Sequence, residues 1–488
     1  MENKEKKQNI IVRRSTELIA AFIAAAACAV FCLWLFKTPE LSPQGIVAAA
    51  VCLALFTLSL IIAVPRALRF FAAREEAAPV ELMGARSTLR RRLHPLAGVF
   101  LTVFFAHILV IVLAYIIHTA VNGYNGTIFS TMRYIWFKRD TDVIHYANIA
   151  ENWYLTNDKD KWALVFLPLY PIIMRAANWI TRDSFVSGMI LNLLFSSAAG
   201  VVIYELALCD LGRRSSRFAV FCAFALPAAI FYVAPMSEPL FLLLTALTLL
   251  LIRKKHFVAA AVTGALAAFT RSLGILLVVP YAAEAVPYLV AHCRANREAG
   301  VKTGKGLAAR IIMIFFGLAF ICCGFGAYLL INKLLWGDWF KFMEFQKENW
   351  YQSMGWFFNT ASYQTDRLVA CFAKGELSTA FGLWLPNLLY IFGALAVFIA
   401  TARELRTSYV LYFAAYFAVA IGATWLLSAP RYLTALVVLP IALSKLCEAR
   451  DDGQGIGRAR CKQAIVGVLL AAGQIVYLAF YVLKYKLY

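Results

Sequence analysis

The chain has 488 residues, 62% of them hydrophobic and 15% charged, and a formal net charge of +20. This balance excludes a soluble globular domain of the same length and indicates a membrane protein with many spans. The positive charge does not indicate nucleic-acid binding, because the basic residues are concentrated in alternate loops between apolar runs.

Apolar runs long enough to cross about 30 Å of hydrocarbon recur along the whole chain. About thirteen such runs predict an all-α fold, a polytopic bundle of transmembrane helices. The runs begin around Glu17, Gln44, Leu96, Ser184, Phe218, Leu240, Phe257, Leu273, Ile311, Thr379, Tyr409, Tyr432 and Ala464.

The basic residues predict the orientation of this bundle. If the N-terminus is cytoplasmic, 30 of the 47 Lys and Arg residues lie in cytoplasmic segments. The short loops on the opposite side carry only Lys37, Arg271 and Arg431, which is the positive-inside pattern. Two long loops, 118–183 and 337–377, are then predicted to lie together on the non-cytoplasmic side.

The first long loop carries acidic residues ahead of a predicted helix. After Asp142, positions 145, 146, 149 and 153 place His, Tyr, Ile and Trp on one face, which predicts an amphipathic helix along the membrane surface. Asp140 and Asp142 lie at its N-terminal end, where the helix dipole stabilises a carboxylate. Either residue is a candidate general base; the alternative is that both only cap the helix.

An apolar piece follows at 163–174, and it is too short and too interrupted by Pro168 and Pro171 to span the bilayer. We interpret it as a re-entrant or surface segment. Tyr170 and Arg175 at its edge could bind a lipid head group, although an arginine that snorkels at the membrane boundary explains Arg175 equally well.

Three short turns on the predicted outer side each carry a charge. Guanidinium groups present a planar donor fork that matches phosphate oxygens, so the two arginines of these turns are candidate phosphate ligands. The alternative is a structural girdle of salt bridges. The charges are Glu238 in the turn 236–239, Arg271 after Thr270, and Arg431 between Pro430 and Tyr432.

The second long loop, with the end of the span before it, is rich in aromatic residues. Such residues at an interface usually form the membrane belt, but their density beside Gln346 and Glu348 indicates sugar stacking. The aromatic residues are Trp336, Trp339, Trp350, Trp356 and Tyr363.

Six of these pieces, in order, resemble the PIG-V family of mannosyltransferases, over the stretch 136–433. The resemblance implies a GT-C membrane glycosyltransferase, which takes a sugar from a polyprenyl or dolichyl phosphate, uses an acidic residue of the first long non-cytoplasmic loop as base, and inverts the anomeric carbon. The pieces are Asp142-Val143-Ile144-His145-Tyr146 with Ile149-Ala150, Phe166-Leu167-Pro168-Leu169-Tyr170-Pro171 with Arg175, Ser237-Glu238-Pro239-Leu240-Phe241, Thr270-Arg271, Gln346 with Trp350, and Pro430-Arg431-Tyr432-Leu433.

The resemblance is carried over by position. Asp142 matches the acidic residue of the family's tryptophan-aspartate motif, and Ser237, Glu238 and Arg271 match its serine-glutamate and threonine-arginine turns.

The chain also departs from the family pattern. Thr141 stands where a tryptophan is usual, Trp153 where a glycine precedes the tyrosine, and Met236 where a tyrosine precedes the serine. These departures bear on the acceptor rather than on the reaction class. Residues 1–95 precede the resemblance and are predicted to form a cytoplasmic tail, a two-helix membrane hairpin and a basic linker. Residues 96–446 form the catalytic core, and 447–488 a cytoplasmic loop and the last membrane helix.

The predicted function is transfer of a mannosyl or related hexosyl group from the carrier phosphate to a hydroxyl of a lipid-linked or cell-envelope glycan. Asp142 is the preferred base and Asp140 its rival. The predicted ligands of the donor phosphate are Arg271, Arg431 and Arg175. The predicted substrate-binding residues are His145, Tyr146, Tyr170, Ser237, Glu238, Gln346, Trp350 and Tyr432.

No cofactor is required by the sequence. An HExxH motif is absent, and the D-x-D triplets 140–142 and 158–160 are short enough to occur by chance, although such a pair can bind a divalent cation. The predicted partners are the donor, the acceptor and membrane lipids, without nucleic acid. The predicted location is the bacterial cytoplasmic membrane, or the endoplasmic reticulum in a eukaryote.

Two other functions remain open. A transporter or flippase for lipid-linked sugars normally carries ionisable residues at the bilayer midplane, and the predicted spans are nearly free of them. A non-catalytic scaffold subunit has no sequence feature against it.

Overall fold

A computed structural model describes residues 2–38, 40–73, 89–123, 126–137, 141–157, 159–300, 304–448 and 455–483. Over these residues the chain is helical, and strand-like pairing is limited to one isolated bridge between Met354 and Ala423. The α-helices are α1 (Glu2–Lys37), α2 (Pro43–Phe71), α3 (Leu89–Asn122), α4 (Ile128–Trp136), α5 (Asp142–Asn152), α6 (Leu169–Thr181), α7 (Ser184–Ala207), α8 (Arg213–Ala225), α9 (Glu238–Arg253), α10 (Phe257–Thr270), α11 (Val278–Glu298), α12 (Gly304–Trp336), α13 (Lys341–Trp350), α14 (Phe357–Ala373), α15 (Leu377–Thr379), α16 (Leu385–Thr401), α17 (Thr407–Ile421), α18 (Ala429–Thr434), α19 (Val438–Leu446) and α20 (Gly455–Val482). Three 3-10 turns, η1 (Lys161–Val165), η2 (Pro227–Tyr232) and η3 (Ser272–Leu277), and one π-helical turn, η4 (Ala380–Trp384), connect them.

The long helices are apolar enough to span a membrane. Among the described residues, eight segments qualify by length and composition: α1, α2, α3, α7, η3 with α11, α12, α15 to α16, and α20. The apolar helices α10 and α17 are shorter. A helix lies at or near every predicted start, which confirms the all-α prediction. The number of spans stays a prediction, because α8, α9 and the pair α18 and α19 are shorter than the usual crossing length of about 20 residues.

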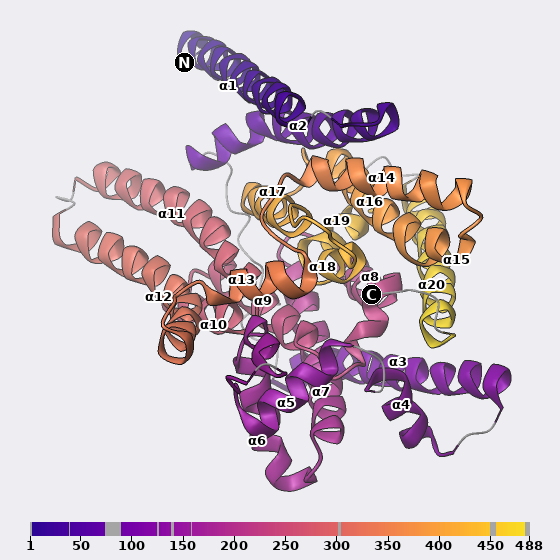
Figure 1. The fold of residues 1–488 in the computed structure, drawn as a ribbon. Helices are drawn as coiled ribbons and strands as arrows, with labels where there is room; N and C mark the ends of the chain where they lie inside the picture. The colour runs from indigo at the N-terminus through magenta and orange to yellow at the C-terminus, as the bar shows by residue number, and fades with distance from the viewer. Residues whose placement is uncertain are drawn as a thin grey trace.

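The N-terminal helices α1 and α2 form the predicted hairpin, and α2 packs on α14, α16 and α17 (Figure 1). Aromatic rings join the hairpin to the rest of the bundle: Trp34 lies edge-on to Phe358, and Phe56 lies 4.6 Å from Phe357. Of the predicted linker 66–95, the first residues complete α2 and the last begin α3, while 74–88 lie outside the described residues.

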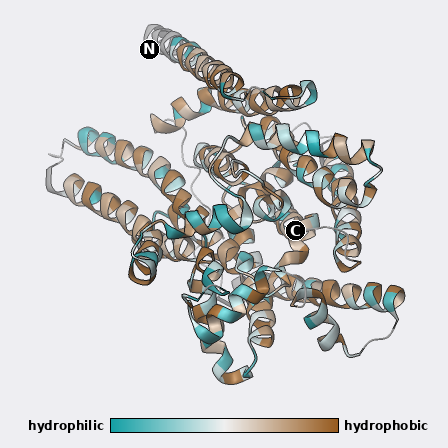
Figure 2. Ribbon diagram, viewed as in Figure 1, coloured by the Kyte–Doolittle hydropathy of each residue, from teal (hydrophilic) through white to brown (hydrophobic). Residues whose placement is uncertain are grey.

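The two long loops contact each other. Trp162 in η1 packs edge-on against Phe345 of α13, with ring centroids 5.5 Å apart, and the hydroxyl of Tyr328 in α12 donates to the carbonyl of Leu164 at 2.7 Å. Hydrophilic residues gather along α5 and α13, whereas α12 is mostly hydrophobic (Figure 2). The contact agrees with the predicted common side of the two loops; which face of the membrane it is stays a prediction.

The segment 163–174 contains a turn and the start of a helix. Pro168 is the N-cap of α6, and Pro171 lies in its first turn, where a missing amide hydrogen leaves no helical bond unmade. With 13 residues, α6 is too short to cross the bilayer. The interpretation of this piece as non-spanning is consistent with its length.

Candidate active site

Asp142 begins helix α5. Thr141 is the N-cap and has an extended backbone, while its hydroxyl donates to the carbonyl of Trp136 at 2.6 Å. The Thr141 side chain makes no capping hydrogen bond to α5, and Asp142 is the first helical residue rather than the N-cap. The helix dipole favours a carboxylate at this first position. Asp140, the rival base, lies outside the described residues.

The predicted helix after Asp142 is confirmed, but it ends one residue before the last predicted position. Trp153 is the C-cap, with φ 66° and ψ −163°, a backbone conformation that glycine adopts far more readily than other residues. The prediction that Trp153 continues the helical face is therefore wrong. The same conformation explains physically why a glycine would suit this position.

The turn before α9 is held by Asn192 in the middle of α7. Its amide donates to the backbone carbonyls of Ala234 and Met236, at 3.0 Å for the latter. These bonds fix the backbone immediately ahead of Ser237 and Glu238, both of which are fully buried. An asparagine inside an apolar helix satisfies backbone groups that have no water to bond.

Arg271 terminates α10, and its extended backbone turns the chain away from the helix. Gly274 permits the tight return, because a Cβ at this position would lie 2.4 Å from the backbone of Ala267. The Arg271 guanidinium is thereby directed at the neighbouring turn. It lies 2.9 Å from Oε1 of Glu238 and donates to the Ser237 hydroxyl at 3.3 Å.

Arg431 in α18 completes a cluster of four charged side chains. One terminal nitrogen of its guanidinium donates to Oε1 of Glu238 at 2.6 Å and to Oδ2 of Asp142 at 2.8 Å. The guanidinium also lies over the ring of Phe231, 5.0 Å from its centroid. We call Asp142, Glu238, Arg271 and Arg431 the Asp142 cluster.

The members of the Asp142 cluster differ in burial. The Asp142 side chain is 29% exposed, that of Arg431 11% and that of Glu238 1%, so the cluster opens to solvent at Asp142. The second carboxylate oxygen of Glu238, Oε2, is buried without a hydrogen-bond partner in the part of the chain that the structure describes. Burial alone would lower the pKa of the Arg431 guanidinium, but the carboxylates of Glu238 and Asp142 raise it above its ordinary value, so both arginines keep their charge.

Three tyrosines, Tyr146, Tyr170 and Tyr432, pack around the Asp142 cluster. Tyr146, one turn after Asp142, shares a hydrogen bond of 2.7 Å with the Ser237 hydroxyl. Burial raises the pKa of the Tyr146 hydroxyl, so it stays protonated. Tyr170 packs edge-on against Tyr146 at 5.4 Å, and the Arg271 guanidinium lies 5.3 Å from the ring centroid of Tyr432.

An aromatic wall stands beside Asp142. His145 stacks on Phe166 at 4.8 Å, and Trp350 lies edge-on to both rings, at 6.0 and 5.8 Å. Trp350 belongs to the second long loop, so both loops contribute to this wall. Gln346, one turn earlier, donates to Gln352 at 2.6 Å and so joins α13 to the segment after it.

The structure thus brings together most of the predicted site residues. Two described residues are exceptions. Arg175 is exposed on α6, Gln346 bonds Gln352, and no hydrogen bond or ion pair of either with the Asp142 cluster is found among the described side chains. The role of Arg175 as a phosphate ligand stays a prediction. The residues that lie in or around the cluster are Asp142, His145, Tyr146, Tyr170, Ser237, Glu238, Arg271, Trp350, Arg431 and Tyr432.

The sequence analysis missed Phe231 and the apolar groove behind it. Phe231 lies between Arg431 and the C-terminal helix, where Tyr477 and Tyr481 contact it edge-on at 6.3 and 5.3 Å. Tyr477 also lines a groove of about 460 Å³ between α16, α19 and α20. A buried asparagine in an apolar helix, Asn192, was a signal in the sequence for the position of this site; nothing in the sequence pointed to Phe231.

The described residues hold no group of three or more His, Cys, Asp or Glu side chains that could bind a metal. Asp140 and Asp158, one from each D-x-D triplet, lie outside those residues.

Comparison with known proteins gives one likeness in structure. No protein-family model matches the chain, and no curated protein matches it significantly. The chain is similar to ArnT from Cupriavidus metallidurans in a crystal structure bound to undecaprenyl phosphate, over 77% of this chain and 74% of that chain, with 14% sequence identity and a TM-score of 0.44. A TM-score of this size identifies neither a family nor an activity, and the PIG-V resemblance stays a prediction.

Proposed function

We propose that the protein is a membrane glycosyltransferase of the GT-C type, which moves a sugar from a polyprenyl-phosphate carrier to an acceptor hydroxyl with inversion. The observation that carries this proposal is the Asp142 cluster. In it, Arg431 donates both to the partly exposed carboxylate of Asp142 and to the buried carboxylate of Glu238. The cluster lies where the two long loops meet, beside an aromatic wall that suits a sugar ring.

An anionic ligand of the cluster would have to displace a carboxylate from an arginine. Two carboxylates and two guanidinium groups cancel formally, so a phosphate that binds Arg431 must compete with one carboxylate. Asp142 is the weaker competitor, because it is more exposed and makes one bond to Arg431, whereas Glu238 is buried and bonds both arginines. Donor phosphate on Arg431 would therefore release Asp142, and the released carboxylate is available as a base.

The reaction then proceeds by displacement at the anomeric carbon. Asp142 takes the proton of the acceptor hydroxyl, the acceptor oxygen forms the new glycosidic bond, and the bond between the anomeric carbon and the carrier phosphate breaks. The electron pair leaves with the phosphate, whose charge Arg431 and Arg271 stabilise. Attack opposite the leaving phosphate inverts the anomeric centre.

The apolar groove supports a prenyl chain as the carrier. Its walls are almost wholly hydrophobic, and Leu389 and Val476 on its rim are more than half exposed, so it opens on the side that faces lipid. Tyr477 connects the groove to Phe231, over which the Arg431 guanidinium lies. A phosphate at Arg431 thus lies next to a surface suited to its hydrocarbon tail.

The finer parts of the proposal rest on the PIG-V resemblance. They are a mannosyl or related hexosyl donor, a lipid-linked or cell-envelope glycan as acceptor, and an active site on the outer face of the bacterial cytoplasmic membrane, or in the endoplasmic reticulum in a eukaryote. Asp140 is the second candidate base, and a divalent cation is not needed by the chemistry of the Asp142 cluster.

The test uses the full chain in lipid nanodiscs with polyprenyl-phosphate mannose and a mixture of glycan acceptors. We expect transfer of radiolabelled mannose, retention of transfer in EDTA, and loss of transfer in Asp142→Asn. A flippase would instead move labelled carrier across a proteoliposome membrane without forming a new glycoside, and that result would reject the proposal. Loss of transfer in EDTA, restored by Mg²⁺ or Mn²⁺, would show that the reaction needs a divalent cation.

A structural girdle is the competing interpretation of the arginines. Binding of polyprenyl phosphate without sugar separates the two interpretations, because a girdle has no affinity for it. We expect Arg271→Gln to lose this binding, with Arg217→Gln, at an exposed arginine of α8, as the matched control. Equal binding by Arg271→Gln and the unchanged protein would favour the girdle.

A further inference from the structure

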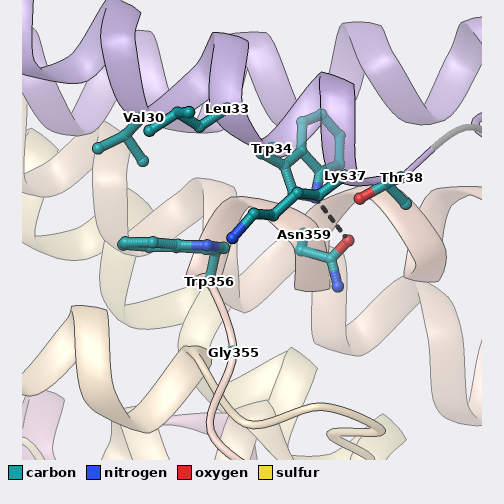
Figure 3. A pocket seen from close by; sticks show the side chains of 8 residues that line it. All are labelled: Val30, Leu33, Trp34, Lys37, Thr38, Gly355, Trp356 and Asn359. Atoms are coloured by element: carbon teal, nitrogen blue, oxygen red, sulfur yellow. Dashed lines mark hydrogen bonds between the residues drawn. The ribbon is translucent and has the colours of Figure 1, made fainter.

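A second cavity, of about 340 Å³, lies between the C-terminal end of α1 and the N-terminal end of α14 (Figure 3). One wall of the cavity belongs to α1 of the N-terminal hairpin, which the proposed glycosyltransferase mechanism does not use. This wall carries Val30, Leu33 and Lys37, and the opposite wall carries Trp356 and Asn359.

The polar groups that line this cavity include donors on both walls. The Lys37 amine reaches across it to the edge of the Trp356 indole (Figure 3), and no hydrogen bond or ion pair of Lys37 occurs within the described ranges. Trp34 donates its indole hydrogen to Oδ1 of Asn359 at 3.0 Å, so the Asn359 amide nitrogen is left to donate to a ligand. An ammonium group, an indole and an amide around one space call for an anionic acceptor.

The other side of the cavity is apolar and continues onto the surface of α1. Leu33 is 60% exposed and Phe36 is 87% exposed on a helix long and apolar enough to span the membrane. Such residues face hydrocarbon in a bilayer. A ligand in the cavity would therefore have its anionic part at the end of α1 and its apolar part along the same helix.

We propose that this cavity binds the phosphate head group of an anionic phospholipid, with Lys37 paired to the phosphate and the acyl chains along Val30 and Leu33. A lysine at a helix end, with its stem on apolar surface and its charge at the interface, suits this geometry. The exposed ring of Trp356 suits the head-group region, where tryptophan is enriched. The site is separate from the Asp142 cluster and does not depend on the proposed function.

The test is native mass spectrometry of the full chain in detergent, with phosphatidylglycerol or phosphatidylcholine of identical acyl chains. We expect preferential retention of phosphatidylglycerol, and Lys37→Gln to reduce that retention about fivefold, the effect of one basic residue on anionic-lipid binding. Lys37→Arg should retain it. Lys374→Gln, which removes an exposed lysine at the far end of α14, is the matched control and should change nothing.

Asn359→Asp is a second variant with the same shape. It keeps the acceptor for Trp34 but places a carboxylate in the cavity, and it should also reduce retention of phosphatidylglycerol. Unchanged retention in both Lys37→Gln and Asn359→Asp would overturn the proposal, as would full displacement of the lipid by soluble glycerol phosphate. Arg271→Gln should keep the lipid; its loss in that variant would place the bound lipid at the Asp142 cluster instead and overturn the proposal too.

Discussion

Two buried glutamates in this protein are each held by two cationic side chains, yet their surroundings differ. Glu284 in α11 accepts four hydrogen bonds: Arg406 donates at 2.5 and 2.9 Å, Lys255 at 3.1 Å and Ser408 at 2.7 Å. Both of its oxygens are used. We call these four residues the Glu284 cluster.

Glu238 uses only one oxygen. Oε1 is shared by Arg431 and Arg271, and Oε2 has no partner among the described residues. Arg431 in turn divides its donors between Glu238 and the exposed carboxylate of Asp142. The Glu284 cluster is therefore saturated and joins α11 to α17. The Asp142 cluster keeps one buried oxygen of Glu238 without a partner among the described residues, and its accessible edge is at Asp142.

The largest expected effect follows from this difference. Asp142→Asn keeps the shape of the side chain but removes the base, so sugar transfer should fall about a hundred- to ten-thousandfold. Its thermal unfolding should change little, because the carboxylate is partly exposed. Glu344→Gln, an exposed carboxylate of α13 in the second long loop, is the control and should transfer normally. Normal transfer by Asp142→Asn would remove it from the role of base.

The two glutamates should respond oppositely to substitution. Glu284→Gln leaves Arg406 and Lys255 without their carboxylate, and breaking a buried ion pair in this way costs about 3–5 kcal/mol of stability, somewhat less here because Lys255 is a third exposed. Thermal unfolding in nanodiscs should show this loss, while transfer per folded molecule stays normal. Glu238→Gln should lower transfer per folded molecule and destabilise less than Glu284→Gln, because Arg431 still pairs with Asp142 and Arg271 still donates to Ser237. If Glu284→Gln and Glu238→Gln lose the same stability and show the same transfer per folded molecule, the two clusters do not differ in function.

Much of this arrangement could be predicted from the sequence. In a chain with so few charges, Glu238, Arg271 and Arg431 are conspicuous at the ends of apolar runs, and positive-inside counting placed them on one side. Their meeting with Asp142 follows because several helix ends on one side of a bundle share a limited area.

The rest depends on how helices distant in sequence pack. Nothing local distinguishes Phe231 from the other 36 phenylalanines, and its place under Arg431 results from packing of η2 against α18 and α20. The saturation of Glu284 likewise requires Arg406, 122 residues away. The helical pattern includes Trp153 at the expected spacing, so the pattern by itself did not show that the backbone of Trp153 has a positive φ.

A smaller effect tests how the arginines of the Asp142 cluster bind. Arg431→Lys keeps the charge but cannot bond Asp142, Glu238 and a phosphate at once, since one ammonium replaces a planar fork. One lost charge-assisted bond corresponds to about 1.5–3 kcal/mol, or roughly ten- to a hundredfold in transfer. This weaker binding should appear as a higher KM for the donor, measured at saturating acceptor. Arg406→Lys, the matching change in the Glu284 cluster, should leave that KM unchanged.

The smallest effect concerns the cost of a positive φ at two residues: Trp153, at the end of α5, and Lys255, just before α10. Trp153 and Lys255 both have positive φ, 66° and 62°, but only Lys255 uses its side chain in a cluster, at 3.1 Å from Glu284. Trp153→Gly should be more stable than Trp153→Ala by about 1 kcal/mol, because both lose the indole and only glycine adopts this backbone freely. Lys255→Gly relieves the backbone cost but also loses the ion pair with Glu284. It should be less stable than the unchanged protein, because the lost ion pair outweighs the relief. Chemical denaturation in mixed micelles measures both. An alanine at 153 as stable as a glycine would show that the end of α5 carries no backbone cost.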